Sequence, residues 1–68
     1  MEESRIHRLL EHRRGGEPFS FKMDLKGKRC TEDEIQELVA YGYIERVLTS
    51  DPNDILYRIT RKGETFLK

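Results

Sequence analysis

Three basic residues lie directly before the start of a predicted helix, and this arrangement is the one in the sequence best suited to binding a ligand. Lys26, Lys28 and Arg29 precede Thr31, where a helical pattern begins. The first turn of a helix has free backbone amides, and these amides bind phosphate groups, especially beside cations. The pattern therefore predicts a phosphate contact here. The alternative is an ordinary solvated charged surface.

Further basic residues in the second half of the chain complete the predicted nucleic-acid-binding set. They are Arg46, Arg58, Arg61 and Lys62. Contacts from such residues hold the nucleic-acid backbone without reading its bases. The chain has 13 Lys and Arg against 13 Asp and Glu, so its formal net charge is zero. DNA binding must therefore depend on a local patch, because the whole molecule has no attractive field for polyanions.

The outer face of the same predicted helix favours a different partner. Asp33, Gln36 and Glu37 lie off its apolar stripe, and no Lys or Arg accompanies them. Carboxylates repel phosphates, so this face is suited to a basic protein surface. Acidic residues in the first turn also have a structural explanation, because they complement the helix dipole. The sequence leaves two functions open: DNA binding, and protein interaction through the acidic face.

The sequence contains no grouping typical of catalysis, a cofactor or a metal site. His7 and His12 are five residues apart, so they do not share one helical face as i, i+4 metal ligands do. Cys30 is the only cysteine, which is typical of a reducing, cytoplasmic location. No apolar run approaches the ~20 residues that span a membrane. We expect no enzyme activity, no cofactor, no metal and no membrane partner.

The length of 68 residues predicts one α+β domain over residues 1–68. A domain of this size buries only about 60% of its unfolded surface, so its core is small. A partner subunit would enlarge the buried core. We therefore expect either a minimal monomer or a homodimer.

The first part of the chain predicts a helix and then a strand. Ile6, Leu9 and Leu10 have the spacing of one helical face over residues 4–14, capped by the serine at its start and stopped by the glycine pair that follows. Over residues 19–25, apolar and polar residues alternate. A period of two predicts a half-buried strand.

The middle of the chain predicts a second helix with well-defined ends. The sequence TEDE at residues 31–34 is a capping box, in which Thr31 and Glu34 bond each other's backbone amides. Ile35 and Leu38 belong to the inward stripe. Gly42 is placed to end the helix in the left-handed conformation.

A β-hairpin and a short helix are predicted to follow. Residues 43–49 and 55–59 are β-prone segments on either side of a turn. In that turn Pro52 presets the backbone, and Asp51 can bond the backbone ahead of it. Thr60 is predicted to cap the final helix.

The segments AYGYIERV and YRITRKGETFLK resemble the second half of a winged-helix domain, over residues 31–68. The resemblance implies a winged-helix fold, with the second predicted helix as the recognition helix and the hairpin as the wing, and it implies DNA binding in transcription control. The expected order is helix, strand, helix, two strands and helix. The helix that normally precedes the recognition helix is expected to be absent or reduced to a turn around residues 26–30. The positions that carry the resemblance are Tyr57, Ile59, Thr60, Lys62, Gly63, Phe66 and Leu67.

Overall fold

The helix α3 (Glu32–Ala40) forms where the sequence predicts it, and reciprocal side-chain bonds fix its start. The backbone N–H of Glu34 donates to Thr31 Oγ1 at 3.2 Å, and the N–H of Thr31 donates to Glu34 Oε1 at 3.0 Å. Gly42 follows the helix with a φ of 82°, the left-handed conformation that a glycine adopts without strain. The predicted capping box and glycine terminator are both confirmed.

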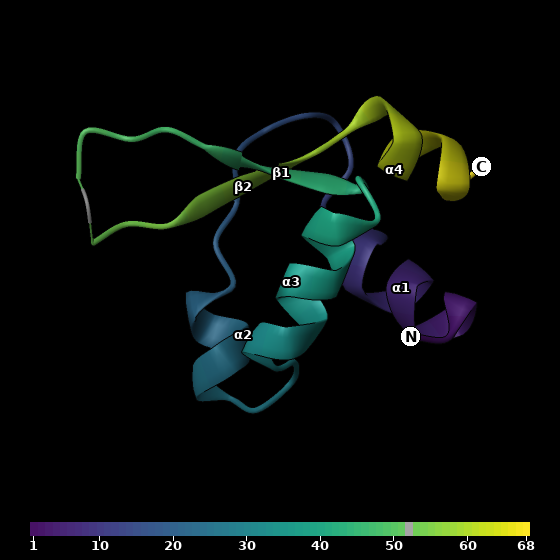
Figure 1. Ribbon diagram of the computed structural model, residues 1–68, viewed down its shortest axis with the longest axis horizontal. Coiled ribbons are helices and arrows are strands. Elements are labelled where there is room, and N and C mark those ends of the chain that lie inside the picture. The colour runs from purple at the N-terminus through teal and green to yellow at the C-terminus, as the bar shows by residue number, and fades with distance from the viewer. Residues whose placement is uncertain (52) are drawn as a thin grey trace.

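The other elements surround α3 in the computed structural model, which describes residues 1–51 and 53–68. Their bounds are α1 (Glu3–Leu10), α2 (Lys22–Lys26), β1 (Ile44–Val47), β2 (Leu56–Ile59) and α4 (Arg61–Phe66). α1 lies beside α3, α2 lies near its N-terminal end, and the β1–β2 hairpin and α4 lie at its C-terminal end (Figure 1). The fold is therefore α+β.

The predicted strand over residues 19–25 is wrong, because most of this segment belongs to the short helix α2, which covers Lys22–Lys26. Phe21 and Leu25 are four residues apart, a spacing that places two side chains on one face of a helix as well as of a strand. Met23 distinguishes the two structures. In a strand its side chain would share the buried face of Phe21 and Leu25, whereas in a helix it leaves that face, and here it is 76% exposed. Phe19 alone retains strand character, as an isolated antiparallel bridge to Tyr57.

The expected order of elements changes accordingly. A helix precedes α3, where only a turn or no helix was expected. Within the described residues the sheet has two strands, without the third strand that the sequence predicted. The first helix is also shorter than expected, because α1 ends at Leu10 and its start is capped by no side chain. The predicted serine cap and the stop at the glycine pair are therefore wrong.

The predicted hairpin is confirmed, with strands somewhat shorter than expected. β1 and β2 pair antiparallel, with Ile44 opposite Ile59 and Val47 opposite Leu56. In the turn, the backbone N–H of Asn53 donates to Asp51 Oδ1 at 2.9 Å, as predicted for Asp51. The prediction for Pro52 lies outside the described residues.

The core receives side chains from almost every element. Leu10, Ile35, Leu38 and Ile44 are the largest fully buried side chains, so α1, α3 and β1 meet at its centre. Among the described residues no polar or charged residue is buried. The remaining core residues are Ile6, Leu9, Phe21, Cys30, Tyr57, Ile59 and Leu67.

The start of α4 is held by Thr60 and by a close contact at Gly63. The backbone N–H of Gly63 donates to Thr60 Oγ1 at 3.1 Å, which confirms the predicted cap. A Cβ atom on Gly63 would lie 2.7 Å from Ile59 Cγ1 and would also strike the carbonyl oxygen of Tyr43. This glycine therefore has a packing role, because it lets α4 approach the sheet.

We predict that Leu38→Ala lowers the free energy of unfolding by about 2–5 kcal/mol, because it leaves a cavity in a small core. Urea unfolding followed by circular dichroism measures the change. Leu48→Ala is the matched control: this leucine is 95% exposed, so its truncation leaves no cavity. Equal losses in the two variants would contradict the inward position of Leu38.

Candidate interaction surface around helix α3

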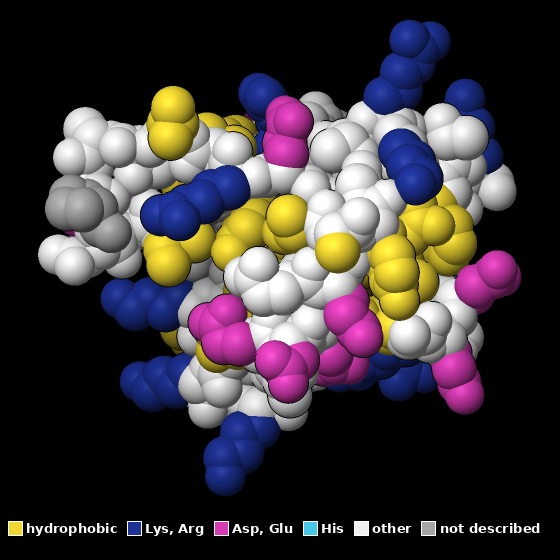
Figure 2. Space-filling view, viewed as in Figure 1, with side chains coloured by type: hydrophobic (Ala, Val, Ile, Leu, Met, Phe, Trp, Pro, Cys, Tyr) yellow, Lys and Arg dark blue, Asp and Glu magenta, His cyan; other side chains and the backbone are white. Residues whose placement is uncertain are grey.

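The outward face of α3 is acidic. Glu32, Asp33, Gln36 and Glu37 are all exposed, whereas Ile35 and Leu38 on the opposite face are buried. Figure 2 shows acidic side chains gathered over α3, while Lys and Arg side chains lie over the hairpin, near α4 and toward the edges of the view. The three residues of the predicted protein-interaction set therefore lie on one accessible surface.

One carboxylate at the start of α3 is occupied inside the fold. Arg5 Nε donates to Glu34 Oε2 at 2.9 Å, and a second guanidinium nitrogen of Arg5 donates to Oε1 at 3.1 Å. The hydrogen bonds from Arg5 and then from the Thr31 backbone lower the pKa of the Glu34 carboxyl, although its partial burial opposes them. The hydrogen bond to Glu34 likewise raises the pKa of Arg5. Glu34 thus joins α1 to α3 and is not available to a partner.

The remaining acidic residues of this face are exposed to solvent. Glu32, Asp33 and Glu37 form no ion pair with any described residue. No Lys or Arg belongs to α3. The surface therefore attracts cations and repels phosphates.

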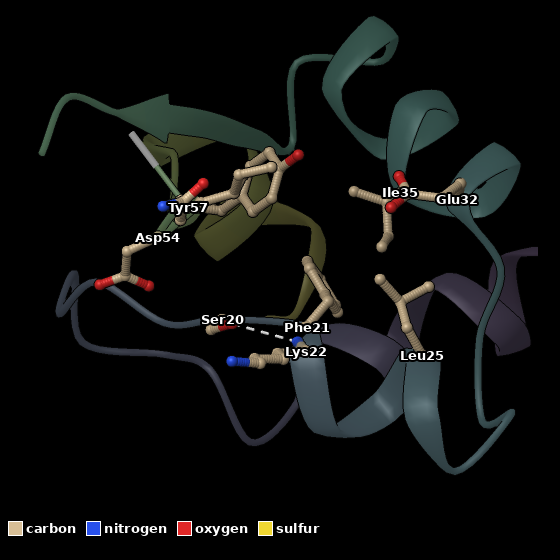
Figure 3. A pocket seen from close by; sticks show the side chains of 10 residues that line it. Ser20, Phe21, Lys22, Leu25, Glu32, Ile35, Asp54 and Tyr57 are labelled. Atoms are coloured by element: carbon tan, nitrogen blue, oxygen red, sulfur yellow. Dashed lines mark hydrogen bonds between the residues drawn. The ribbon is translucent and has the colours of Figure 1, made fainter. Parts of the chain in front are cut away.

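A groove with an apolar floor lies beside this face. Phe21, Leu25, Ile35 and Tyr57 point into a common space between α2, α3 and the hairpin (Figure 3). The volume of the groove is about 200 Å³. Ile55, which is 44% exposed, extends the apolar lining along the hairpin. The groove is large enough to take an apolar side chain from a partner.

Charged side chains surround that floor. Glu32 of α3 and Asp54 of the hairpin lie on its rim, together with Lys22 of α2. Lys22 is held at the start of α2, where its backbone N–H donates to Ser20 Oγ at 3.1 Å. With two carboxylates and one ammonium group, the rim has a net negative charge. It therefore has the same sign of charge as the adjoining α3 face.

The predicted basic residues do not converge on one surface. Lys26 ends α2, and Lys28 and Arg29 lie in the turn before α3. Arg61 and Lys62 start α4, near the opposite end of α3 (Figure 1). The basic residues therefore flank the acidic face on two sides.

Two of the predicted cations are used within the fold. Arg58 lies opposite Glu45 in the hairpin, and its guanidinium contacts that carboxylate at 2.8 Å. Lys62 Nζ donates to the carbonyl oxygen of Tyr41 at 2.7 Å and lies 5.3 Å from the centre of the Tyr43 ring. Both residues have structural partners, so they are weaker candidates for phosphate contacts.

The hairpin cations also lie on different faces. Arg46 is paired in register with Tyr57, whereas Arg58 is paired with Glu45. Neighbouring positions of a strand point to opposite sides of the sheet. Arg46 and Arg58 therefore do not form one patch.

The predicted phosphate site at the start of α3 already contains a carboxylate. Glu34 Oε1 accepts from the Thr31 backbone amide, and Glu32 and Asp33 are in the same first turn. A phosphate at this helix start would meet three acidic residues. Lys28 and Arg29 can contact phosphate through their own side chains, without help from this capped helix end.

The sequence does not predict that Phe21, Leu25 and Ile35 form a groove. Phe21 and Leu25 were assigned to a strand, and Ile35 was assigned to the core. The groove exists because α2 is a helix that stands against α3 and the hairpin. The i, i+4 spacing of Phe21 and Leu25 fits a strand as well as a helix, so no local signal in the sequence reveals the groove.

Comparison with protein-family models, with curated proteins and with solved structures found no match to this chain. Across the described residues, none of the helices has the length and apolar character needed to cross a bilayer. The same residues contain no cluster of three or more metal-ligating side chains.

We predict that Glu34→Gln destabilises the protein near pH 7 and that its deficit relative to the unmodified protein shrinks in acid. A carboxyl with a lowered folded pKa stabilises the fold above its unfolded pKa, about 4.3 for glutamate, and this stabilisation disappears as pH falls through the folded value. Thermal unfolding between neutral and acidic pH measures the difference. Glu37→Gln, on the same helix but unpaired, should show almost no such trend. A deficit independent of pH would contradict the ionic role of Glu34.

Proposed function

We propose that this chain is a winged-helix domain that docks a basic, partly apolar segment of another protein on α3 and the adjoining groove. The winged-helix assignment is supported by the sequence of α2, turn, α3 and hairpin, and by the bridge from Phe19 to Tyr57 beside that hairpin. The glycine contact at Gly63 accounts for part of the motif that carries the resemblance. Fold alone does not decide function, so the partner is inferred from the surface.

The observation that carries the proposal is the unpaired acidic face of α3. In a winged helix this face would enter the DNA major groove. Here it would bring Glu32, Asp33 and Glu37 against phosphates, without a cation on the same helix. A basic protein segment would instead be attracted and oriented by these carboxylates.

The apolar groove gives the partner a second point of attachment. An apolar side chain entering the groove over Phe21 and Tyr57 would leave water, and burial of apolar surface contributes about 25 cal/mol per Å². Glu32 and Asp54 on the rim suit flanking lysines or arginines of the same segment. The partner chemistry is therefore a short segment in which basic residues flank an apolar one.

We predict that a labelled peptide with alternating Lys and Leu residues binds and that Asp33→Lys with Glu37→Lys weakens this binding by about tenfold or more. Fluorescence anisotropy measures the dissociation constant. The same peptide with Glu in place of Lys should not bind. The variant pair Glu3→Lys and Glu17→Lys makes the same change in net charge away from α3. Equal weakening by both pairs would show an effect of total charge and would refute docking on α3.

A second candidate function is attachment to the DNA backbone, favoured by the cations that flank α3. Lys26, Lys28, Arg29 and Arg46 are exposed and form no ion pair within the described part of the chain. Such residues neutralise phosphates and release counterions, which produces binding that falls steeply with salt. This candidate requires contact beside α3, with its acidic face held away from the phosphates.

We predict for this second candidate that mixed-sequence duplex DNA binds at low salt and that Lys28→Glu with Arg29→Glu abolishes binding. Anisotropy at increasing salt gives the slope of log affinity against log salt, from which the number of phosphate contacts follows. Arg14→Glu with Lys68→Glu is the charge-matched control. Absence of binding by the unmodified protein at low salt would remove the DNA candidate and leave the protein-docking proposal untouched.

A further inference from the structure

A second groove, of about 350 Å³, lies between α1 and the turn from α2 to α3, and it shares no lining residue with the groove beside the hairpin. Its lining is dominated by guanidinium groups from three segments of the chain. The charged residues that line it are Arg5, Arg8, Arg13 and Arg29, together with the single acid Asp24.

Two of these arginines are fixed in place by the fold. Arg5 is held by Glu34 and donates to the backbone carbonyl of Arg29. Arg13 donates to Asp24 Oδ2 at 2.7 Å and to the carbonyl of Leu9 at 2.9 Å. Its guanidinium also lies 4.6 Å from the centre of the Phe21 ring. These contacts give the groove a rigid cationic wall, with little side-chain entropy left to lose on binding.

The other two arginines are available to a ligand. Arg8 of α1 and Arg29 of the turn are exposed, and neither side chain pairs with an acid among the described residues. The Nε atom of Arg13 is buried and has no hydrogen-bond partner, so the accessible donors come from Arg8 and Arg29. The groove therefore retains unused guanidinium donors.

The local charge balance of this groove differs from that of the whole chain. Four arginines face Asp24 and the Glu34 carboxylate that pairs with Arg5, so the positive charges exceed the negative ones by two. The chain as a whole has a formal net charge of zero. The excess therefore belongs to this concave region and is not a background property of the surface.

We propose that this groove binds a small phosphoryl anion of the pyrophosphate type. Guanidinium groups bond phosphate oxygens in pairs, through parallel N–H donors, and do so more specifically than ammonium groups. The volume of the groove lies within the range of small-molecule sites. Arg8 and Arg29 come from different segments, so a ligand with two linked anionic groups would engage both.

Binding here would also reinforce the joint between α1 and α3. The anion would tie Arg8 of α1 to Arg29 of the turn, beside the existing contact between Arg5 and Glu34. A ligand that binds only the folded state stabilises it by mass action. Saturating pyrophosphate is therefore expected to raise the melting temperature, and this readout does not depend on any partner of α3.

The test is titration of the intact protein with sodium pyrophosphate at constant ionic strength, followed by amide chemical shifts in NMR spectra. We expect saturable shifts centred on Arg8, Arg13 and Arg29. Arg8→Gln with Arg29→Gln should weaken binding by about tenfold, whereas Arg46→Gln with Arg61→Gln, which removes the same charge elsewhere, should change it by less than about twofold. Circular dichroism checks that each variant is folded.

Several outcomes would overturn the proposal. Shifts that do not saturate, or equal weakening in the two double variants, would show a general response to charge. Duplex DNA that displaces pyrophosphate and shifts the same amides at lower concentration would make the groove a nucleic-acid contact. Asp33→Lys with Glu37→Lys should leave pyrophosphate binding intact, so failure of the α3 proposal and failure of this one are distinguishable.

Discussion

The carboxylate of Glu34 joins three segments of this small domain. That group accepts hydrogen bonds from the Thr31 backbone and from two nitrogens of Arg5, and Arg5 in turn donates to the carbonyl of Arg29. The start of α3, the turn before it and the first turn of α1 are thereby fixed to one another. The groove beside the hairpin is lined in part by α3, and the groove lined by arginines is lined in part by α1. A single side chain thus helps to position two surfaces of opposite charge.

The two charged regions coexist because they belong to different neighbours of α3. The acidic region is the outward face of the helix itself, at Asp33 and Glu37, whereas the basic region lies between α1 and the turn that contains Arg29. The formal net charge of the chain is zero, although these two regions carry charges of opposite sign. The fields of such charges act over about 8 Å at physiological salt.

Features set by local chemistry could be predicted from the sequence. The capping box at Thr31, the left-handed Gly42 and the Thr60 cap depend on residues within a few positions of one another, and all three are present. The segment from Phe19 to α2 was mispredicted because its apolar spacing satisfies two periods, and only its packing against α3 and β2 decides between them. The Arg5 contact with Glu34 spans 29 positions, so nothing local indicates it. Both grooves depend on such distant contacts, and neither was foreseen.

The tight fit at Gly63 has a consequence for how domains of this kind diverge. Any side chain there would strike Ile59 and the Tyr43 backbone, so descendants of this chain that keep the fold should keep this glycine. Asp33 and Glu37 touch no part of the core and are free to drift to other charges, with a new partner as the result. The buried residues would then stay similar among descendants, while a few surface substitutions could change the partner that is bound. Two descendants could share every buried residue of this chain and still have no partner in common.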